Sequence, residues 1–269
     1  MRDRKILFVT GAASGIGREV ARYFCERGWF AGLTDVNEAG LAETAAMIGE
    51  DNCWTHPLDV TDRDAWARVI EAFSQRTEGR MHLLFNNAGI GKGGRFEEMD
   101  PADIDKLVAI NFTGVMNGTQ AAFDLLKASP GACILNTSSA SGIYGSAGLS
   151  VYSATKFAVR GLTEAWDIEF ASHNIRVRSL MPGFIDTGIL SAVGEDSNQT
   201  GKERLQAAGI EVSPVSMIGP AAWDAVHGNA VHTPVNKMAR QLMFAARFFP
   251  GRVRKRMGLL NGLDEAAED

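Results

Sequence analysis

A short apolar strand runs directly into a glycine-rich turn near the N-terminus: Ile6-Leu7-Phe8-Val9-Thr10-Gly11-Ala12-Ala13-Ser14-Gly15-Ile16-Gly17. Apolar residues with helical spacing follow at 19–27. Residues 6–9 are apolar throughout rather than alternating, which is typical of a strand that is buried on both faces of a parallel sheet. This strand, turn and helix predict the first unit of a doubly wound α/β fold.

The same alternation of a short apolar run and a longer helical pattern repeats as far as residue 180. It predicts a Rossmann-type doubly wound parallel sheet with right-handed crossovers and helices on both faces, in three layers α/β/α. No linker interrupts the pattern before residue 187, so residues 1–269 are expected to form a single domain. The expected strands are 6–9, 30–34, 53–57, 83–85, 133–137 and 175–180, and the expected helices are 19–27, 39–48, 63–76, 101–128 (one or two) and 153–171.

The composition excludes several classes of protein. Lys and Arg number 27 against 32 Asp and Glu, a net charge of −5, so the basic excess of a nucleic-acid-binding protein is absent. Hydrophobic residues make up 45% of the chain and charged residues 22%, which is typical of a folded globular protein. Glycine is over-represented, with 29 residues and no Gly-X-Y repeat; these glycines are expected to serve turns that other residues cannot form.

Cysteine, histidine and apolar patterns indicate the compartment. Cys25, Cys53 and Cys133 are widely spaced and form no C-x-x-C pair, which favours a reducing interior. The histidines form neither H-x-x-x-H nor H-E-x-x-H, so we expect no metal site. Residues 6–9 are too few for a secretory signal and no run approaches the ~20 apolar residues of a membrane span. We therefore expect a cytoplasmic protein.

The spacing of Gly11, Gly15 and Gly17 suits a phosphate-binding turn. Glycines let the backbone approach a pyrophosphate closely, and the following helix supplies free N–H groups and the positive end of its dipole. The alternative is a tight turn with no ligand. Ser14, before the second glycine, is uncharged and therefore offers no clamp for an additional phosphate.

Asp35 ends the second expected strand, 18 residues after Gly17. An acidic residue at this place accepts hydrogen bonds from the adenosine ribose hydroxyls and repels a 2′-phosphate, which favours NAD over NADP. No Arg or Lys follows closely. The alternative is an ordinary aspartate at the end of a strand.

Further motifs follow in order: Asn86-Asn87-Ala88-Gly89, Asn111, Ser139, Tyr152-x-x-x-Lys156 and Pro182-Gly183. With Thr10-Gly11-x-x-x-Gly15-Ile16-Gly17, this set closely resembles the single-domain type of the short-chain dehydrogenases/reductases over residues 5–187. The resemblance implies an enzyme that transfers a hydride between NAD(H) and a small secondary alcohol or ketone. It also implies assembly into a homodimer or homotetramer.

The residues themselves suggest the chemistry. Tyr152 and Lys156 lie at i and i+4, on one face of a helix, where an ammonium would lower the pKa of a phenol from ~10 towards neutrality. Ser139, at the end of the fifth strand, can donate to a substrate carbonyl oxygen. Side chains alternate along a strand, so only one of Ser138 and Ser139 faces the site, and the family spacing selects Ser139. The alternative for Tyr152 and Lys156 is an ordinary exposed pair.

The family resemblance implies the remaining roles. Tyr152 would be the general acid/base, Lys156 would also bind the nicotinamide ribose, and Asn111 would hold a water in a proton relay. For Asp59 a capping or turn role is the alternative. The residues expected to bind the cofactor are Gly11, Ser14, Gly15, Ile16 and Gly17 at the pyrophosphate, Asp35, Asp59 and Val60 at the adenosine, Asn87, Ala88 and Gly89 beneath its ribose, and Tyr152, Lys156, Pro182, Gly183, Ile185 and Thr187 at the nicotinamide.

Two segments depart from the regular pattern. Residues 188–217 are small and polar without a clear period and are expected to form either a substrate lid or a surface insertion. They would line the substrate pocket together with residues 140–149, and Tyr144 and Phe184 flank it or pack in the core.

Residues 234–269 form an atypical C-terminal extension without the Asp-Gly-Gly signature of many family members. We expect a short last strand at 230–231, broken by His232-Thr233-Pro234, then a helix at 238–249 and a solvated tail that holds the basic cluster 252–256. A roof over the substrate site and contact with an anionic membrane are the less favoured alternatives. Because the Asp-Gly-Gly signature is absent, a tetramer contact through the last strand is in doubt. The expected interface between subunits is then formed by the helices near 102–128 and 153–171.

Two other functions remain as alternatives. One is an NADPH-dependent carbonyl reductase. Asp35 discriminates between this function and an NAD-dependent one, because its carboxylate would repel the 2′-phosphate of NADPH. The other is a nucleotide-binding Rossmann protein without catalysis, against which Asn111, Ser139, Tyr152 and Lys156 argue.

Overall fold

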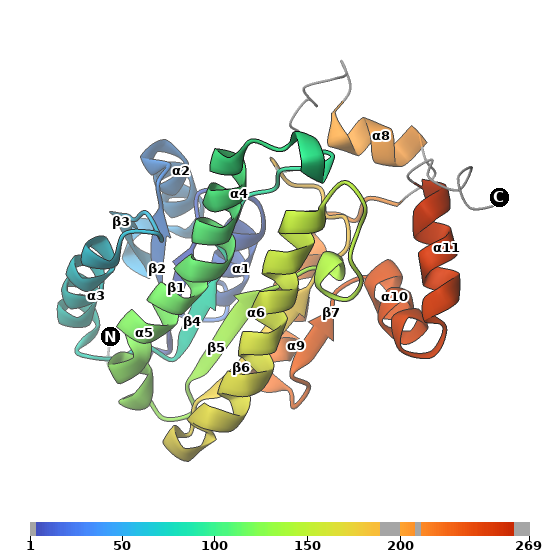
Figure 1. Ribbon diagram of the computed structural model, residues 1–269. Coiled ribbons are helices and arrows are strands. Elements are labelled where there is room, and N and C mark those ends of the chain that lie inside the picture. The colour runs from blue at the N-terminus through green and yellow to red at the C-terminus, as the bar shows by residue number, and fades with distance from the viewer. Residues whose placement is uncertain (1–3, 189–199, 208–210, 261–269) are drawn as a thin grey trace, which may run out of the picture.

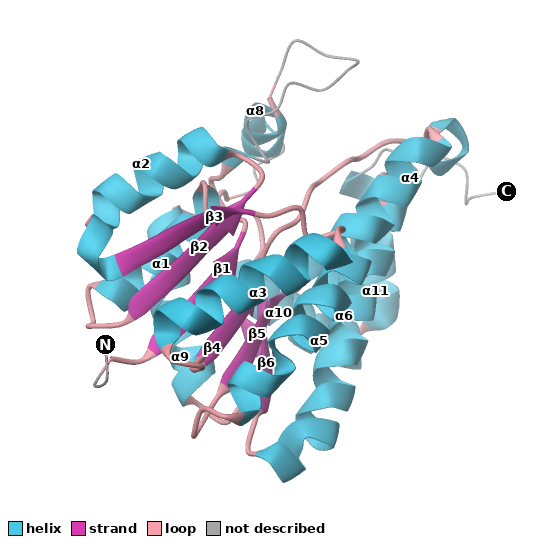
Figure 2. Cartoon of the chain, turned by 90° about the vertical axis from the view of Figure 1, so that its left-hand side faces the viewer, coloured by secondary structure: helices cyan, strands magenta, loops and turns pink. Residues whose placement is uncertain are grey.

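The computed structural model describes residues 4–188, 200–207 and 211–260. Seven strands form one parallel sheet in the order β3-β2-β1-β4-β5-β6-β7 (Figures 1 and 2). The predicted doubly wound parallel sheet is therefore confirmed. The strands are β1 Ile6–Thr10, β2 Phe30–Asp35, β3 Cys53–Pro57, β4 Leu83–Asn86, β5 Cys133–Thr137, β6 Arg176–Met181 and β7 His232–Pro234.

Helices cover both faces of the sheet, because alternate residues of a strand point to opposite sides and the central strands carry apolar residues on both. Leu7 and Val9 of β1 pack in a cluster with α1, α2 and α9, whereas Ile6 and Phe8 pack with α3, α5 and α6. The three layers are visible in Figure 2. The helices are α1 Gly15–Cys25, α2 Glu38–Ile48, α3 Arg63–Thr77, α4 Pro101–Val108, α5 Gly114–Lys127, α6 Ser150–Glu169, α8 Gly201–Ala207, α9 Ile218–His227, α10 Lys237–Phe248 and α11 Pro250–Leu260.

The expected helix at 101–128 consists of two α-helices joined by one π-helical turn. Pro101 opens α4 at a position where its missing N–H costs nothing, and the π turn Ala109–Thr113 leads without a break into α5. π turns inside helices are rare and frequently lie at functional sites. Asn111 lies in the middle of this one.

The last strand differs from the prediction. His232-Thr233-Pro234 does not break a strand at 230–231 but itself forms β7, paired in register with Ser179, Leu180 and Met181. Proline is tolerated there because β7 is an edge strand and Pro234 is its last residue. His232 anchors β7 through its ring nitrogens, to Ser179 Oγ and to Glu164 of α6, both at 2.8 Å.

The C-terminal segment also differs from the expected solvated tail. The basic cluster 252–256 belongs to α11, which follows α10 after a sharp turn. Of the proposed lid at 188–217, the structure shows helix α8 and a bridge between Ile185 and Ser213. Residues 189–199, 208–210 and 261–269 lie outside the described residues.

The order of the strands positions the site. The chain builds outward from β1 to β3, then crosses to β4 on the other side of β1 and builds outward to β7. In open parallel sheets, ligands bind beyond the carboxyl ends of the strands at such a reversal. The reversal falls between β1 and β4, whose carboxyl ends lead into the glycine turn and into Asn87.

Candidate active site

The glycine turn after β1 is packed too closely for side chains. A Cβ on Gly17 would clash with the carbonyl oxygen of Gly11, and one on Gly11 would lie 2.9 Å from Ala88 Cα. Gly11 and Gly15 have φ values of 69° and 53°, which glycine adopts without strain. The turn is a backbone cradle that fits the close approach of a phosphate group.

The N-terminus of α1 also has backbone N–H groups that no capping side chain occupies. Asn37, Asp62 and Asp100 cap α2, α3 and α4 by accepting hydrogen bonds from backbone N–H groups. Ser14 precedes α1 in extended conformation but makes no such side-chain bond. An anionic ligand can therefore take the place that a side chain occupies on α2, α3 and α4. The residues present fit a dinucleotide pyrophosphate.

Asp35 meets the glycine turn from the end of β2. Its carboxylate accepts hydrogen bonds from the backbone N–H groups of Ala13, at 3.1 Å, and Asn37, at 3.0 Å. These bonds fix the carboxylate where β2 ends, and each oxygen retains a lone pair for a second donor. The structure thus brings Asp35 to the glycine turn.

Asp59 and Val60 follow β3 at the same edge of the sheet. Asp59 Oδ1 accepts hydrogen bonds from Thr61 N at 2.9 Å and Thr61 Oγ1 at 2.7 Å. This is the turn role that we considered as the alternative for Asp59. The Val60 carbonyl accepts from Trp66 Nε1 and Asn117 Nδ2, which holds this loop against α3 and α5.

Asn87, Ala88 and Gly89 leave β4 beside the glycine turn. Asn87 Nδ2 donates to the carbonyls of Thr10 and Gly11 at 3.0 and 3.2 Å. Thr10 Oγ1 in turn accepts from the N–H groups of Asn87 and Ala88, both at 3.0 Å. These bonds join the two strands at the reversal of the sheet and explain why the turn is so tightly held.

Asn111 is buried and fixed by its own side chain. Its Oδ1 accepts from Ile90 N and its Nδ2 donates to Ile90 O, each at 2.9 Å. A Cβ on Gly89 would lie 3.2 Å from Asn111 Oδ1 and 3.6 Å from Lys156 Nζ. Glycine at 89 therefore keeps open the space between Asn111 and Lys156.

The neighbouring serines after β5 have different surroundings. Ser138 Oγ donates to the carbonyl of Lys156 at 2.9 Å and ties the loop to α6. Ser139 Oγ accepts from Ser141 N at 3.1 Å, and the Ser139 side chain acts to lower the pKa of Tyr152. Because the Ser139 oxygen accepts from a backbone N–H, its own proton is available to donate.

Tyr152 and Lys156 share one face of α6, where Lys156 is buried and Tyr152 is half-buried. Lys156 Nζ lies 5.5 Å from the Tyr152 ring centroid and donates to Thr137 O at 3.0 Å. Burial lowers the pKa of Lys156 to about 8. Burial also raises the pKa of Tyr152, against the opposing effect of the Ser139 side chain. The expected lowering of the phenol pKa by the ammonium is therefore wrong for the protein alone, because burial dominates.

The loop after β6 closes the site. Pro182 and Ile185 are buried, and a Cβ on Gly15 would lie 3.3 Å from Thr187 Cγ2. A Cβ on Gly183 would lie 2.6 Å from Met238 Cε and 2.7 Å from Asn236 Oδ1. The loop thus runs from the start of α10 to the glycine turn. Tyr144 and Phe184 are both half-buried beside it.

Sequence reasoning missed several supporting residues. Thr10 and Ile90 hold Asn87 and Asn111 as described above. Arg18 donates to Thr44 Oγ1 and pairs with Glu43, and it also bonds to the Ala13 carbonyl behind the glycine turn. Arg18 precedes Asp35 in the chain, whereas a cation near the adenosine was expected to follow Asp35. Its position in the first turn of α1, directly after Gly17, was the available signal.

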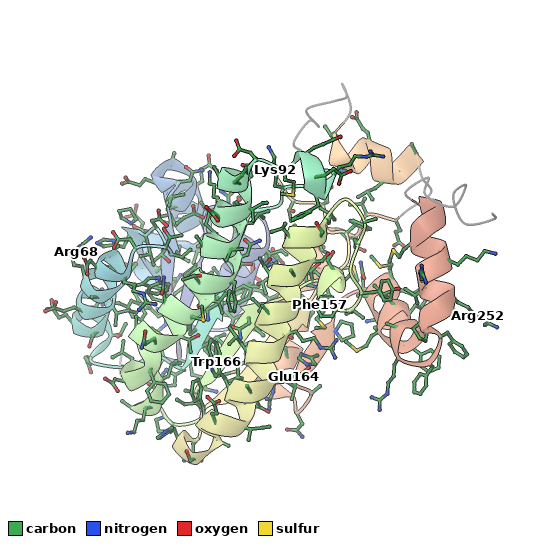
Figure 3. All side chains as sticks on the ribbon, viewed as in Figure 1. Arg68, Lys92, Phe157, Glu164, Trp166 and Arg252 are labelled. Carbon is green, nitrogen blue, oxygen red and sulfur yellow. The ribbon has the colours of Figure 1, made fainter. Side chains whose placement is uncertain are left out.

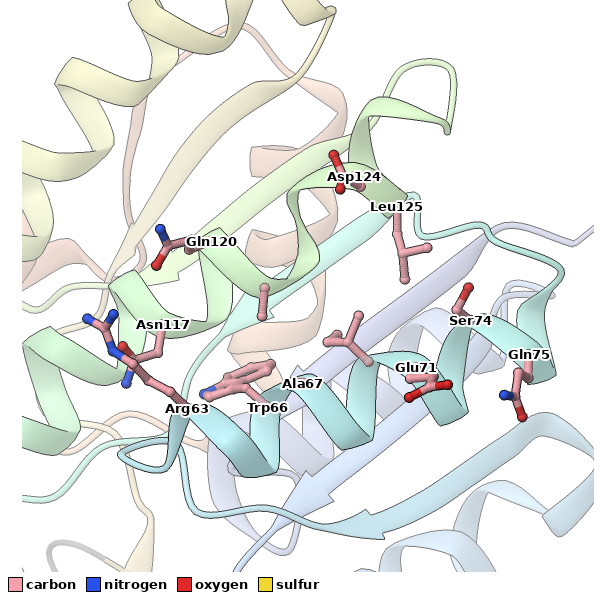
Figure 4. Close-up of a pocket in the computed structure, with 12 residues that line it drawn as sticks. Arg63, Trp66, Ala67, Glu71, Ser74, Gln75, Asn117, Gln120, Asp124 and Leu125 are labelled. Carbon is pink, nitrogen blue, oxygen red and sulfur yellow. The ribbon is translucent and has the colours of Figure 1, made fainter.

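A surface groove of about 530 Å³ lies elsewhere, between α3 and α5 (Figure 4). It is lined by residues such as Arg63, Ile70, Gln120 and Asp124. None of the predicted site residues lines it, so we assign it no chemistry. Within the described ranges, no group of three or more His, Cys, Asp or Glu side chains could hold a metal ion.

Comparison with known proteins agrees with this arrangement. The short chain dehydrogenase family model matches residues 5–198. Over 207 residues, 76% of this chain and 83% of the relative, the sequence is 35% identical to the 3-oxoacyl-(acyl-carrier-protein) reductase FabG of Thermotoga maritima. It is 36% identical over 199 residues to the 2,5-dichloro-2,5-cyclohexadiene-1,4-diol dehydrogenase LinX of Sphingobium indicum, covering 71% of this chain and 77% of the relative.

Among solved structures, the 3-ketoacyl-(acyl-carrier-protein) reductase of Brucella melitensis complexed with NADH superposes with a TM-score of 0.76. The two sequences are 28% identical, and the match covers 86% of this chain and 96% of that one. Together these matches show that the chain belongs to the short-chain dehydrogenase/reductase family, whose members are Rossmann-fold oxidoreductases that use a nicotinamide cofactor.

Proposed function

We propose that this protein is an NAD-dependent dehydrogenase that transfers a hydride between NAD(H) and a secondary alcohol or ketone. The observation that carries this proposal is the arrangement around the Tyr152 ring: Lys156 Nζ lies 5.5 Å from the ring centroid, and the Ser139 side chain acts to lower the pKa of the phenol. A hydroxyl donor and a phenol then face one point, where a substrate oxygen can bind both. When bound, the nicotinamide ring accepts or supplies the hydride.

Each residue has a defined task in this proposal. In oxidation, Tyr152 takes the proton of the substrate hydroxyl as the C–H hydride leaves for the cofactor, and in reduction it returns that proton. Ser139 donates a hydrogen bond to the substrate oxygen, where negative charge develops. Lys156 holds a positive charge near the phenolate and binds the nicotinamide ribose. Asn111, fixed by Ile90, holds a water that connects this group to solvent.

The raised pKa of Tyr152 favours the protonated phenol in the protein alone. A protonated phenol is the form required to donate to a ketone oxygen. Oxidation in turn requires the positive charge of Lys156 to favour the phenolate. The substrate is to be found by a turnover screen with NAD that begins with 3-oxoacyl compounds and cyclic diols, the compound classes in the names of the two relatives, and continues with steroids and sugars.

The preference for NAD rests on the carboxylate of Asp35. In Asp35→Ala, the ratio of kcat/KM for NAD to that for NADP should fall at least about tenfold, because the charge that repels a 2′-phosphate is lost. Asp35→Asn is the matched variant, since its amide oxygen can still accept from Ala13 N. Steady-state kinetics with both cofactors measure the ratio. An unchanged ratio in both variants would contradict NAD selection by Asp35 and favour the NADPH-dependent alternative.

We also propose a homo-oligomer that assembles through α5 and α6. The outer surface of α6 exposes Phe157 by 41% and Ile168 by 80%, and Figure 3 shows the helix along the front of the molecule. Apolar side chains of this size on one exposed helix favour a subunit contact.

A further inference from the structure

The helical hairpin α10–α11 stands at one end of the molecule, beyond β7 (Figure 1). Its inner side is part of the fold. Ala239 of α10 is fully buried and packs with Ala140, Ile143 and Met181, and Val253 of α11 is also buried. The hairpin is therefore packed on the loop that follows Ser139, and its outer side has a fixed orientation relative to the rest of the protein.

Three phenylalanines gather on the outer side, around the turn between the two helices. Phe244, Phe248 and Phe249 are exposed by 60%, 57% and 44%. The Phe244 ring centroid lies 4.9 Å from that of Phe248 and 6.2 Å from that of Phe249. A cluster of large apolar side chains on the surface indicates a site that binds another protein or a membrane.

Cations surround this aromatic cluster. The Arg247 guanidinium lies 5.6 Å from the Phe248 ring centroid, and that of Arg252 lies 5.1 Å from the Phe249 centroid. Residues 237–260 contain no Asp or Glu, although the whole chain carries a net charge of −5. Their basic residues are Lys237, Arg240, Arg247, Arg252, Arg254, Lys255 and Arg256.

We propose that this tip, made of Phe244, Phe248, Phe249, Arg247 and Arg252, docks the protein on a membrane surface that contains anionic lipids. The aromatic rings would enter the boundary between headgroups and acyl chains, while the guanidinium groups bind lipid phosphates. The contact is peripheral: among the helices of the described residues, none is long and apolar enough to cross a bilayer.

The charge decides between the possible occupants. A second copy of the same tip would bring two sets of cations together and is therefore repelled. An anionic lipid surface complements the cations and also accepts the rings. The sequence carries Asp264, Glu265, Glu268 and Asp269 further on, beyond the described residues. The experiment consequently uses the full chain.

The test is co-sedimentation of the full-length protein with vesicles of phosphatidylcholine plus phosphatidylserine and with vesicles of phosphatidylcholine alone. We expect binding to the anionic vesicles only, and its loss in about 1 M salt, where the Debye length is ~3 Å. The double variant Phe244→Ser/Phe248→Ser and the variant Arg252→Gln should each weaken partitioning, the former at least about tenfold.

Matched controls lie on other faces of the protein. Met47 of α2 is 55% exposed, and the Arg68 side chain of α3 is 69% exposed at the opposite end of the molecule from Arg252 (Figure 3). Met47→Ser and Arg68→Gln should bind vesicles like the wild type. The proposal is overturned by absence of binding at low salt or by equal loss in variants and controls. A dimer that the phenylalanine variants convert to monomer, without vesicle binding, would also overturn it. The measurement does not depend on turnover, so it succeeds or fails separately from the proposed function.

Discussion

Ser139 and Ser138 are adjacent hydroxyls with opposite expected roles. Ser139→Ala removes the donor to the substrate oxygen and should lower kcat about 10²-fold, with little change in stability. Ser138→Ala removes the bond from Ser138 Oγ to the Lys156 carbonyl and should cost about 1 kcal/mol of stability, with turnover largely retained. Steady-state kinetics and chemical denaturation of both variants separate the two effects. Equal kcat in the two variants would show that the wrong serine has been assigned.

Lys156 should cost the folded protein stability at neutral pH. Burial lowers its pKa from 10.5 to about 8, and each pH unit of difference corresponds to 1.36 kcal/mol, on the order of 3 kcal/mol in total. Lys156→Met removes this cost together with one hydrogen bond worth about 1 kcal/mol. The variant should therefore be inactive but at least as stable as the wild type at pH 7.

The pH dependence gives this prediction its sign. Between pH 8 and 10.5 the unfolded chain binds the Lys156 proton and the folded protein releases it. Stability rises with pH wherever the unfolded state binds more protons. The free energy of unfolding of the wild type should therefore increase relative to that of Lys156→Met between pH 8 and 10.5. Urea denaturation of both proteins at several pH values measures the difference. A constant difference from pH 7 to 10 would mean that Lys156 is not destabilised by burial.

At the scale of elements, Gly17 of α1 and Gly161 of α6 differ in their surroundings. A Cβ on Gly17 would clash with the Gly11 carbonyl, whereas a Cβ on Gly161 meets nothing within 4 Å. Gly17→Ala should destabilise the protein by at least ~2 kcal/mol and weaken NAD binding. Gly161→Ala should stabilise it by ~0.5–1 kcal/mol, since alanine suits a helix interior better.

Thermal unfolding and NAD titration of the two variants measure these effects. The pair is informative because both changes add one methyl group to a helix. If Gly17→Ala bound NAD like the wild type, the close packing of the glycine turn would have no bearing on the cofactor.

At the scale of the whole molecule, the sequence predicted the sheet because its central strands are apolar on both faces. The glycine turn, Asp35, Asn87, Ser139 and Pro182 lie at the carboxyl edge because each of these motifs ends or closely follows a strand, whereas Asn111, Tyr152 and Lys156 reach it from helices. The spacing along the chain was sufficient to predict that Asp35 ends the strand beside the glycine turn and that Tyr152 and Lys156 share one face of a helix. The edge strand β3 differs, since its residues after Cys53 are all partly or fully exposed.

The elements that sequence reasoning missed depend on tertiary contacts. Pro234 suggested that the last strand is broken, yet the proline is accommodated because it pairs with β6 at the edge of the sheet. The basic cluster at 252–256 suggested a tail, but Val253 within it is buried and the segment forms helix α11 beside α10. The pKa of Tyr152 follows from burial that residue spacing does not reveal.

The central claim is that Tyr152 moves the proton during hydride transfer, and one variant tests it most directly. Tyr152→Phe removes only the phenolic oxygen, so NAD should bind with unchanged affinity while kcat falls at least ~10²-fold. Tyr23→Phe is the control, because Tyr23 lies on α1 packed against Trp223 and Arg27. NAD affinity by calorimetry and turnover on the best substrate of the screen are measured for both. Lost turnover with intact NAD binding in Tyr152→Phe alone is the predicted result, and turnover equal to that of the wild type would contradict the account.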